Sequence, residues 1–207
     1  NASWMEPFQE SLTEDGTFTT LDGEEVTVPM MSQDGPENYL YLDGEGYQAV
    51  ELPYVGWEVA MLVILPDGGE FTAFEEGVSV AKYQEIVDGL SSQSIALRMP
   101  KFEFESEFSL ADTLSNLGMP LPFSTAADFS GMTGGKDLYI SDVFHKAFIS
   151  VDEKGTEAAA ATAVLMELTA MPASPIELEI DQPFLFLIRD RGTGAVLFLG
   201  RVVDPAS

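Results

Sequence analysis

The sequence predicts an α+β fold made mainly of antiparallel β-sheets with a few helices. Three observations support this class. Short strand-like runs recur along most of the chain, glycine-containing turns separate many of them, and only two segments place apolar residues at helical spacing. The chain has 207 residues, 45% of them hydrophobic, and contains no internal repeat and no linker. That length suffices for one hydrophobic core, so we expect a single domain over residues 1–207.

The first expected element is a meander of antiparallel strands. Asp22-Gly23 separates its first two strands and is a typical hairpin signal. Its last strand contains an uninterrupted apolar run over residues 59–65, which predicts burial on both faces. The five strands are expected at residues 18–21, 25–31, 38–42, 47–53 and 58–65.

Two helices are expected after this meander. The first covers residues 80–90, and Ser79 is placed to cap its N-terminus. The second covers residues 109–117 and is followed by Gly118, which is typical of a helix end. The positions expected to face inward are Val80, Tyr83, Ile86, Val87 and Leu90 in the first helix and Leu110, Leu114 and Leu117 in the second.

Further strands are expected between and after the helices. One long strand should cover residues 95–105. Residues 138–151 are apolar on both alternating faces, which is typical of a strand buried inside a sheet. The last three strands are expected at residues 176–180, 184–189 and 195–202, and a turn at residues 191–194 joins the final two.

The charge and the composition exclude several classes of function. Thirty-five acidic and nine basic residues give a net charge of −26, which argues against nucleic acid because phosphate binding needs a positive surface. We interpret the acidity as a solubilising surface, with adaptation to high salt as a sharper hypothesis. There is no cysteine, which excludes disulfides and leaves the compartment open. No run of about eighteen apolar residues and no signal-peptide pattern occurs, so no membrane partner is expected.

No catalytic residue, cofactor or metal site is expected. His145 is the only histidine, and its place in a strand favours a structural role over that of a general base. The sequence has no Gly-x-Ser-x-Gly motif, and a zinc site would have to depend mostly on carboxylates. Residues 131–137 lack the spacing of a phosphate-binding loop. We therefore predict that the protein is not an enzyme.

The segment over residues 151–172 has two interpretations when it is taken alone. Its propensity is helical, because Thr156 can cap a helix and residues 158–161 are alanines. Its place between a buried strand and distant strands instead suits an exposed loop that later becomes a strand. In a strand, one face would carry only small uncharged side chains, those of Thr156, Ala158, Ala160 and Thr162.

This segment resembles the hinge of the reactive-centre loop of inhibitory serpins, in particular prokaryotic ones. Other motifs stand in serpin order across nearly the whole chain, which makes the resemblance specific. They are Val28-Pro-Met-Met31, Leu52-Pro-Tyr54, Leu65-Pro-Asp67, Pro100-Lys-Phe102, Asp128-Phe-Ser-Gly131, Phe144-His-Lys-Ala-Phe148, Gln182-Pro-Phe-Leu-Phe186 and Leu197-Phe-Leu-Gly-Arg201. The resemblance implies the C-terminal part of a metastable serpin fold, with the reactive-centre loop at about residues 155–175.

For function, the resemblance implies a serine protease inhibitor that acts as a suicide substrate. The protease cuts the loop, and the loop then inserts into the large sheet. Counting from Glu153 places the reactive bond at Thr169 and Ala170, with Leu168 and Met171 as alternatives. A small uncharged residue before the cut suits an elastase-like or subtilisin-like serine protease, and a cysteine protease is a further alternative.

The resemblance also assigns roles to individual residues. His145, Trp4 and Lys101 correspond to the region where the sheet opens, although Asn1 and Trp4 are closer together than in most serpins. Lys101 is expected to form a partly exposed ion pair with Glu153, worth about 1 kcal/mol. The hinge is expected to comprise Glu153, Gly155, Thr156, Glu157, Ala158, Ala159, Ala160, Ala161 and Thr162.

Partners and location are likewise implied by the resemblance. We expect the full-length protein to be a monomer, extracellular or secreted, whose partner is the target protease. The first alternative is a non-inhibitory serpin that acts as a binding, storage or chaperone-like module, or an inactive truncated fragment. The second is an unrelated β-rich interaction domain, for which the ordered motifs would be coincidence.

Overall fold

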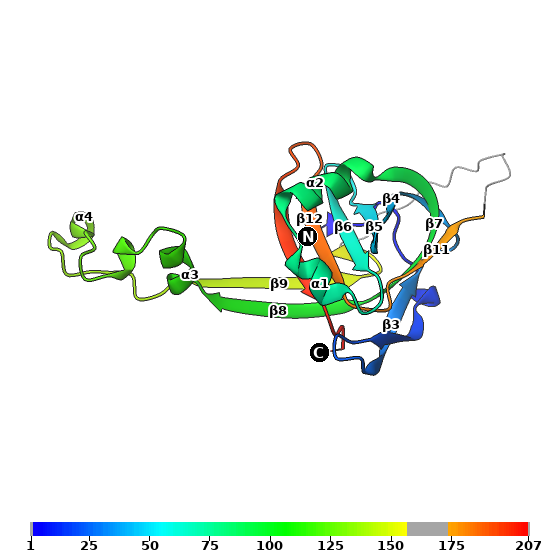
Figure 1. The fold of residues 1–207 in the computed structure, drawn as a ribbon, viewed down its shortest axis with the longest axis horizontal. Coiled ribbons are helices and arrows are strands. Elements are labelled where there is room, and N and C mark those ends of the chain that lie inside the picture. Colours follow the sequence, from blue (N-terminus) through cyan, green and yellow to red (C-terminus); the bar gives the residue numbers. More distant parts are fainter. Residues whose placement is uncertain (1, 157–173, 207) are drawn as a thin grey trace. The chain divides into compact units, whose positions relative to one another are not determined.

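A computed structural model describes residues 2–156 and 174–206 of the chain. It divides into two compact units, the first drawn from residues 1–103 and 150–207 and the second from residues 104–149. Figure 1 shows the elements of both. Among the helices described, none has the length and apolar character that crossing a membrane requires. The expected single domain over residues 1–207 stays a prediction.

The first unit is built around a large sheet, which has nine strands among the described residues. Its order is β13-β12-β6-β5-β4-β7-β3-β2, and β11 pairs with β7 in parallel, whereas the other pairs are antiparallel. The strands are β2 (Glu14–Thr19), β3 (Glu25–Ser32), β4 (Glu37–Gly44), β5 (Tyr47–Pro53), β6 (Val59–Pro66), β7 (Ser91–Pro100), β11 (Ile176–Glu179), β12 (Phe184–Asp190) and β13 (Val196–Val202).

The antiparallel meander expected from the sequence is only partly confirmed. β2 pairs with β3, and β4, β5 and β6 pair in succession, but β7 lies between β3 and β4. The first strand, β2, also covers residues 14–19 instead of the expected 18–21. Gly23 lies in the turn between β2 and β3 with φ 82°, a conformation that glycine adopts readily. Every residue of β6 after Val59 is buried, as its apolar run predicted. The long strand expected over residues 95–105 is wrong, because β7 ends at Pro100 and β8 (Phe102–Ser109) begins in the other sheet.

Two helices pack on one face of the large sheet, α1 (Phe71–Glu76) and α2 (Val80–Gly89). Figure 1 shows both near β6 and β12. Their buried side chains belong to a core of Tyr47, Ala49, Leu62, Ile64, Phe71, Ile86, Leu185 and Leu187. The Ser79 cap is confirmed, since its hydroxyl accepts the N–H of Lys82 at 3.2 Å. Val80 was wrongly expected inward: it opens the helix and is 84% exposed.

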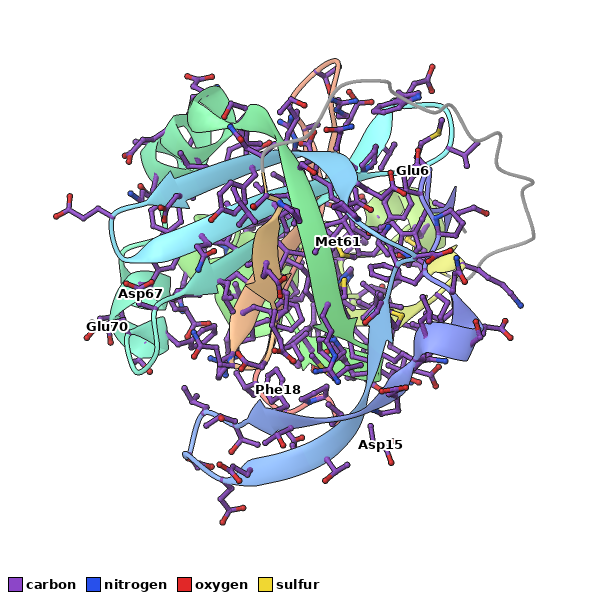
Figure 2. All side chains as sticks on the ribbon, turned by 90° about the vertical axis from the view of Figure 1, so that its right-hand side faces the viewer. Glu6, Asp15, Phe18, Met61, Asp67 and Glu70 are labelled. Carbon is purple, nitrogen blue, oxygen red and sulfur yellow. The ribbon has the colours of Figure 1, made fainter. Side chains whose placement is uncertain are left out.

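The opposite face of the sheet is also covered by apolar side chains. The ring of Phe102 contacts those of Phe184 and Phe186, with centroids 5.7 and 5.6 Å apart. Figure 2 shows Met61 in the interior, whereas Asp15 and Asp67 lie at the periphery. Most acidic residues thus lie at the surface, and the two that are buried among the described residues, Glu51 and Glu153, pair with basic side chains.

The second sheet has the order β1-β10-β9-β8 among the described residues, where β1 is Ala2–Ser3, β10 is Gly155–Thr156 and β9 is Phe144–Asp152. The strand expected over residues 138–151 therefore starts later. It is also less buried than expected, because Phe144 and Phe148 are 68% and 50% exposed. An apolar run favours burial on both faces, but burial requires elements that cover them, and the described residues leave these two side chains uncovered.

The rest of the second unit consists of short helices and turns. Its helices are α3 (Ala111–Asn116), the 3-10 helix η2 (Leu121–Phe123) and α4 (Ser130–Thr133), whereas the 3-10 helix η1 (Glu10–Leu12) belongs to the first unit. The helix expected over residues 109–117 is confirmed in a shorter form. Leu117 lies beyond its end and is 79% exposed, so its expected inward position is wrong.

Candidate functional site

The site expected from the sequence falls only partly within the described residues. The reactive-bond residues Leu168, Thr169, Ala170 and Met171 and the hinge residues Glu157, Ala158, Ala159, Ala160, Ala161 and Thr162 lie outside them. Described are the base of the hinge, which we define as Glu153, Gly155 and Thr156, and the surrounding residues Trp4, Lys101 and His145. All of these except His145 belong to the first unit.

The chain reverses direction at the base of the hinge. The carboxylate of Asp152 accepts the N–H groups of Lys154 at 2.8 Å and of Gly155 at 3.1 Å, which fixes a tight turn after β9. Gly155 and Thr156 then form β10, which lies between β1 and β9 and is antiparallel to both. The hinge therefore begins as a strand inside a sheet, not as the helix that residue propensity alone would favour.

Gly155 is required by the close approach of β1. Its φ is 149°, in a region that side-chain-bearing residues rarely adopt. A Cβ atom at this position would lie 2.2 Å from the carbonyl oxygen of Ala2 and 2.7 Å from the Cα atom of Ser3. Both obstacles are backbone atoms, so neither can swing aside as the end of a side chain could.

Thr156 is anchored to the core through Tyr54. Their hydroxyl oxygens are 2.7 Å apart, so one donates a hydrogen bond to the other. Tyr54 is 2% exposed, and its ring stacks on that of Trp4 at 4.7 Å with an interplanar angle of 8°. Burial raises the pKa of Tyr54 well above its usual range, although the bond to Thr156 opposes this rise. The phenol therefore stays neutral at physiological pH and remains available as a donor.

Trp4 ties the N-terminal segment to the turn that precedes β10. Its indole N–H donates to the carbonyl of Asp152 at 2.9 Å, and its backbone N–H donates to the carbonyl of Lys154 at 2.9 Å. The N–H of Phe8 donates to the carbonyl of Glu153 at 2.9 Å. Three hydrogen bonds from one short segment thus satisfy three successive backbone carbonyls of the turn.

Glu153 is held by two donors from different elements. Its carboxylate pairs with Nζ of Lys101 at 2.9 Å and accepts the hydroxyl of Thr13 at 2.7 Å. The pairing with Lys101 is as expected, but Glu153 is only 5% exposed, so the expected partly exposed pair is buried at its acidic end. Burial raises the pKa of Glu153, and the hydrogen bonds from Lys101 and Thr13 outweigh it, so that the pKa is lowered overall.

His145 belongs to the second unit, unlike the other residues of the predicted site. It lies on β9 and is exposed, so the role that the resemblance gives it stays a prediction. Two residues of the site were missed by sequence reasoning, Tyr54 and Thr13. Tyr54 belongs to the Leu-Pro-Tyr motif that supports the family resemblance, but that motif gave it no role in the site. Nothing in the sequence around Thr13 indicates a partner 140 positions away. Within residues 2–156 and 174–206, no cluster of three or more metal-ligating side chains occurs.

Comparisons with known proteins agree with this geometry. The family model described as serpin (serine protease inhibitor) matches residues 1–205. A serpin-like protein of Thermococcus kodakarensis is 42% identical over 99% of this chain and 47% of its own length. The leukocyte elastase inhibitor of Bos taurus is 36% identical over 98% of this chain and 55% of its own.

A solved structure extends the likeness to the fold. Human thyroxine-binding globulin complexed with its ligand superposes with a TM-score of 0.86 at 34% identity, over 100% of this chain and 54% of that one. The chain thus spans about half the length of the relatives it matches.

Proposed function

The chain belongs to the serpin family, and on this premise we propose that the protein containing it inhibits a serine protease as a suicide substrate. Because the chain spans about half the length of its relatives, this activity is proposed for the whole protein. The matched relatives differ in their named functions. One is named an elastase inhibitor, and another is named for the binding of thyroxine.

The observation that carries the proposal is the position of β10. Gly155 and Thr156 pair with β9 and β1 at the same time, so the hinge enters the sheet between two strands. Beyond Val151, the edge of β9 that faces β10 has no partner strand among the described residues, over residues 144–150. A loop released by cleavage could extend β10 along this edge, which would supply main-chain hydrogen bonds for each residue added.

The side chains of the hinge suit this extension. If the present register continued, Ala158 would come opposite Ile149, two positions along from the pair of Thr156 with Val151. Ile149 and Val151 are buried, at 6% and 1% exposure, so the incoming residues must be small. Alanine and threonine meet this requirement, whereas a large or charged side chain would cost packing or desolvation energy.

The chemistry would be supplied by the protease. Its serine attacks the carbonyl carbon of Thr169, the bond to the nitrogen of Ala170 breaks, and an acyl-enzyme ester remains on Thr169. Insertion of the released loop as a strand would carry the attached protease away before water hydrolyses the ester. A small uncharged residue before the cut fits an elastase-like or subtilisin-like pocket, and the name of the bovine relative favours the former.

A second candidate function is ligand binding without inhibition. The structural likeness to thyroxine-binding globulin is the observation that favours it. The two functions differ in the state of the protein after cleavage. An inhibitor forms a covalent complex and becomes more stable to heat after it is cut, whereas a binding protein that does not insert its loop is only nicked.

The deciding experiment mixes the full-length protein with pancreatic elastase and with subtilisin. We expect a protease complex that survives SDS and a new N-terminus at Ala170. Ala158→Arg should be cleaved at the same bond without forming the complex, because its charged side chain would have to enter opposite buried Ile149. Ala158→Ser is the matched control, since it stays small and should retain most of the complex. Cleavage of the native protein without any complex would contradict the proposal.

A further inference from the structure

A cavity of about 260 Å³ lies in the first unit, beside the turn that joins β5 to β6. Side chains from several parts of the large sheet line it, among them Leu40 on β4, Glu51 and Pro53 on β5, and Trp57 and Arg191 in turns. Its volume suits a molecule of about ten non-hydrogen atoms, just below the usual range of ligand pockets. The cavity shares no lining residue with the base of the hinge.

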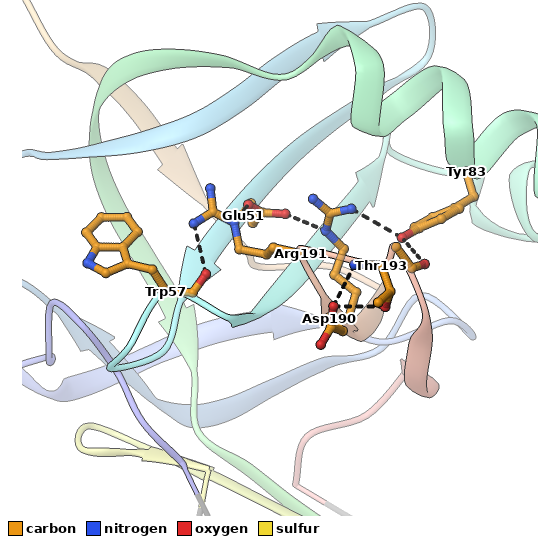
Figure 3. A network of polar contacts seen from close by, with 8 residues as sticks. Glu51, Trp57, Tyr83, Asp190, Arg191 and Thr193 are labelled. Carbon is orange, nitrogen blue, oxygen red and sulfur yellow. Dashed lines mark hydrogen bonds and ion pairs between the residues drawn. The ribbon is translucent and has the colours of Figure 1, made fainter.

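Glu51 lies in the wall of this cavity and holds two arginines. It is 1% exposed, and its two carboxylate oxygens take separate partners, with Nε of Arg189 at 2.6 Å and Nε of Arg191 at 2.9 Å. Arg189 also donates to the hydroxyl of Tyr83 at 3.3 Å. Figure 3 shows this network. Glu51 thus pairs with two cations, whereas the carboxylate of Asp190, which stands between the two arginines in sequence, accepts hydrogen bonds from Thr193.

The sharing of one carboxylate by two cations is unusual in so acidic a chain. All nine basic side chains form ion pairs, and each of the seven outside this network pairs with acids that no other basic residue shares. Among the ion pairs of the described residues, only Glu51 is shared by two cations. Neither guanidinium here therefore has a carboxylate to itself among these ion pairs.

Arg191 is the member of the network that a ligand can reach. Its side chain is 26% exposed, against 8% for Arg189. Besides its bond to Glu51, it donates from Nη1 to the carbonyl of Trp57 at 3.3 Å. A guanidinium has five N–H donors, so three remain without an acceptor among the described residues. These donors can bind a carboxylate in the planar fork geometry that arginine favours.

Trp57 supplies an apolar wall from the hairpin turn that joins β5 to β6. It follows Gly56 in that turn, and both have the positive φ that hairpin loops use, 63° for Trp57 and 98° for Gly56. The indole of Trp57 is 50% exposed and lies 5.6 Å from the guanidinium of Arg191.

We propose that this cavity binds a small, flat organic acid with a single negative charge. The carboxylate would bind the free N–H groups of Arg191, and the apolar body would lie against Trp57, Pro53 and Leu40. One negative charge suits the single partly exposed guanidinium of Arg191, whereas a dianion such as a phosphate monoester would be repelled more strongly by the carboxylate of Glu51. The aromatic wall favours a planar body over a branched one.

The test uses 4-fluorobenzoate as the probe and the full-length protein. Ligand-observed fluorine NMR detects weak binding, and unlabelled benzoate should displace the probe. We expect a dissociation constant in the millimolar range. The neutral analogue 4-fluorobenzamide has nearly the same shape and should bind at least about tenfold more weakly, because it cannot pair with a guanidinium.

Two arginine variants locate the site. Arg191→Gln should weaken the binding of 4-fluorobenzoate at least about tenfold. Arg201→Gln is the matched control, since it also removes an exposed arginine paired with a glutamate, and binding should stay the same. Trp57→Ala should weaken binding and leave the ion pairs of Glu51 intact. It therefore tests the site even if Arg191→Gln does not fold. Equal binding of the amide, unchanged binding in Trp57→Ala, or no saturable binding to the native protein would each overturn the proposal.

Discussion

At the scale of single residues, Gly155 offers the most direct test of the hinge geometry. An alanine Cβ at this position would lie 2.2 Å from the carbonyl oxygen of Ala2. The alanine would also have to adopt a φ of 149°. Gly155→Ala should therefore push β1 away from β10 and destabilise the protein by about 2 kcal/mol or more. Urea unfolding of the native protein and the variant measures the difference.

Gly131→Ala provides the control for this substitution. Gly131 lies in α4, and an added Cβ would meet nothing within 4 Å. Because alanine has the better helix propensity, this variant should be neutral or slightly more stable. If Gly155→Ala were equally harmless, the close packing of β1 against the hinge would be wrong.

Glu153 should make stability depend on pH in a defined direction. Its pKa in the folded protein is lower than its ordinary value of 4.5, so the unfolded state takes up the proton first as the pH falls. The stabilisation is fully present above about pH 4.5 and is lost as the pH falls through the lower folded pKa. Glu153→Gln should remove this contribution, so the stability difference between native protein and variant should shrink below pH 4.5.

The control for this pH dependence is Glu105→Gln in the second unit. Glu105 also pairs with a lysine, Lys146, but both side chains are more than half exposed. Solvent screens such a pair, so its removal should change the stability little. If the free energy of unfolding of Glu153→Gln and of the native protein changed in parallel from neutral pH to pH 3, the ionised Glu153 would not contribute the predicted stability.

At the scale of elements, β10 is held in place by more than its backbone. The hydroxyl pair of Tyr54 and Thr156 links it to the large sheet, under the stacked ring of Trp4. We expect Tyr54→Phe and Thr156→Val each to destabilise the protein, and the double variant to cost about 1 kcal/mol less than the sum of the two. Urea unfolding of the four proteins closes this double-mutant cycle. Strict additivity would mean that the two hydroxyls do not stabilise each other.

The fold could be predicted from the sequence wherever local pattern and tertiary environment agree. The apolar run of β6 is buried, and Ser79 caps α2 as its position before the helix predicts. The hydrophobic pattern gave a wrong or missing prediction where a strand is not covered by other elements and where a helix is too short. Residues 144–148 are apolar in part but exposed, and α1 has six residues, too few for a periodic signal.

The site was predictable to a similar extent. The pair of Lys101 with Glu153 follows from the resemblance, because both positions match the motif of the family. Its burial does not follow, since it depends on Thr13 and on the N-terminal segment, which no local pattern connects to residue 153. Long-range contacts of this kind lie outside what spacing along the chain can indicate.

At the scale of the whole molecule, the main feature is the large negative net charge. Each of the nine basic side chains already pairs with a carboxylate, so most acidic side chains among the described residues have no cation of their own, and the chain carries a formal charge of −26. Figure 2 shows two of them, Asp15 and Asp67, at the periphery. Folding brings these charges closer together than they are in the unfolded chain, so their repulsion favours unfolding.

Salt should therefore stabilise this protein. The screening length falls from about 10 Å at 0.1 M to about 3 Å at 1 M, so the midpoint of thermal unfolding should rise as KCl is increased over this range. Salt also strengthens apolar burial, and a charge variant separates the two effects. Replacing the exposed Asp15, Glu25 and Asp67 by Asn, Gln and Asn should raise the midpoint at low salt and flatten its rise. Exchanging the three for Glu, Asp and Glu keeps the charge and should keep the full slope, and equal slopes in both triple variants would show that surface repulsion is not the cause.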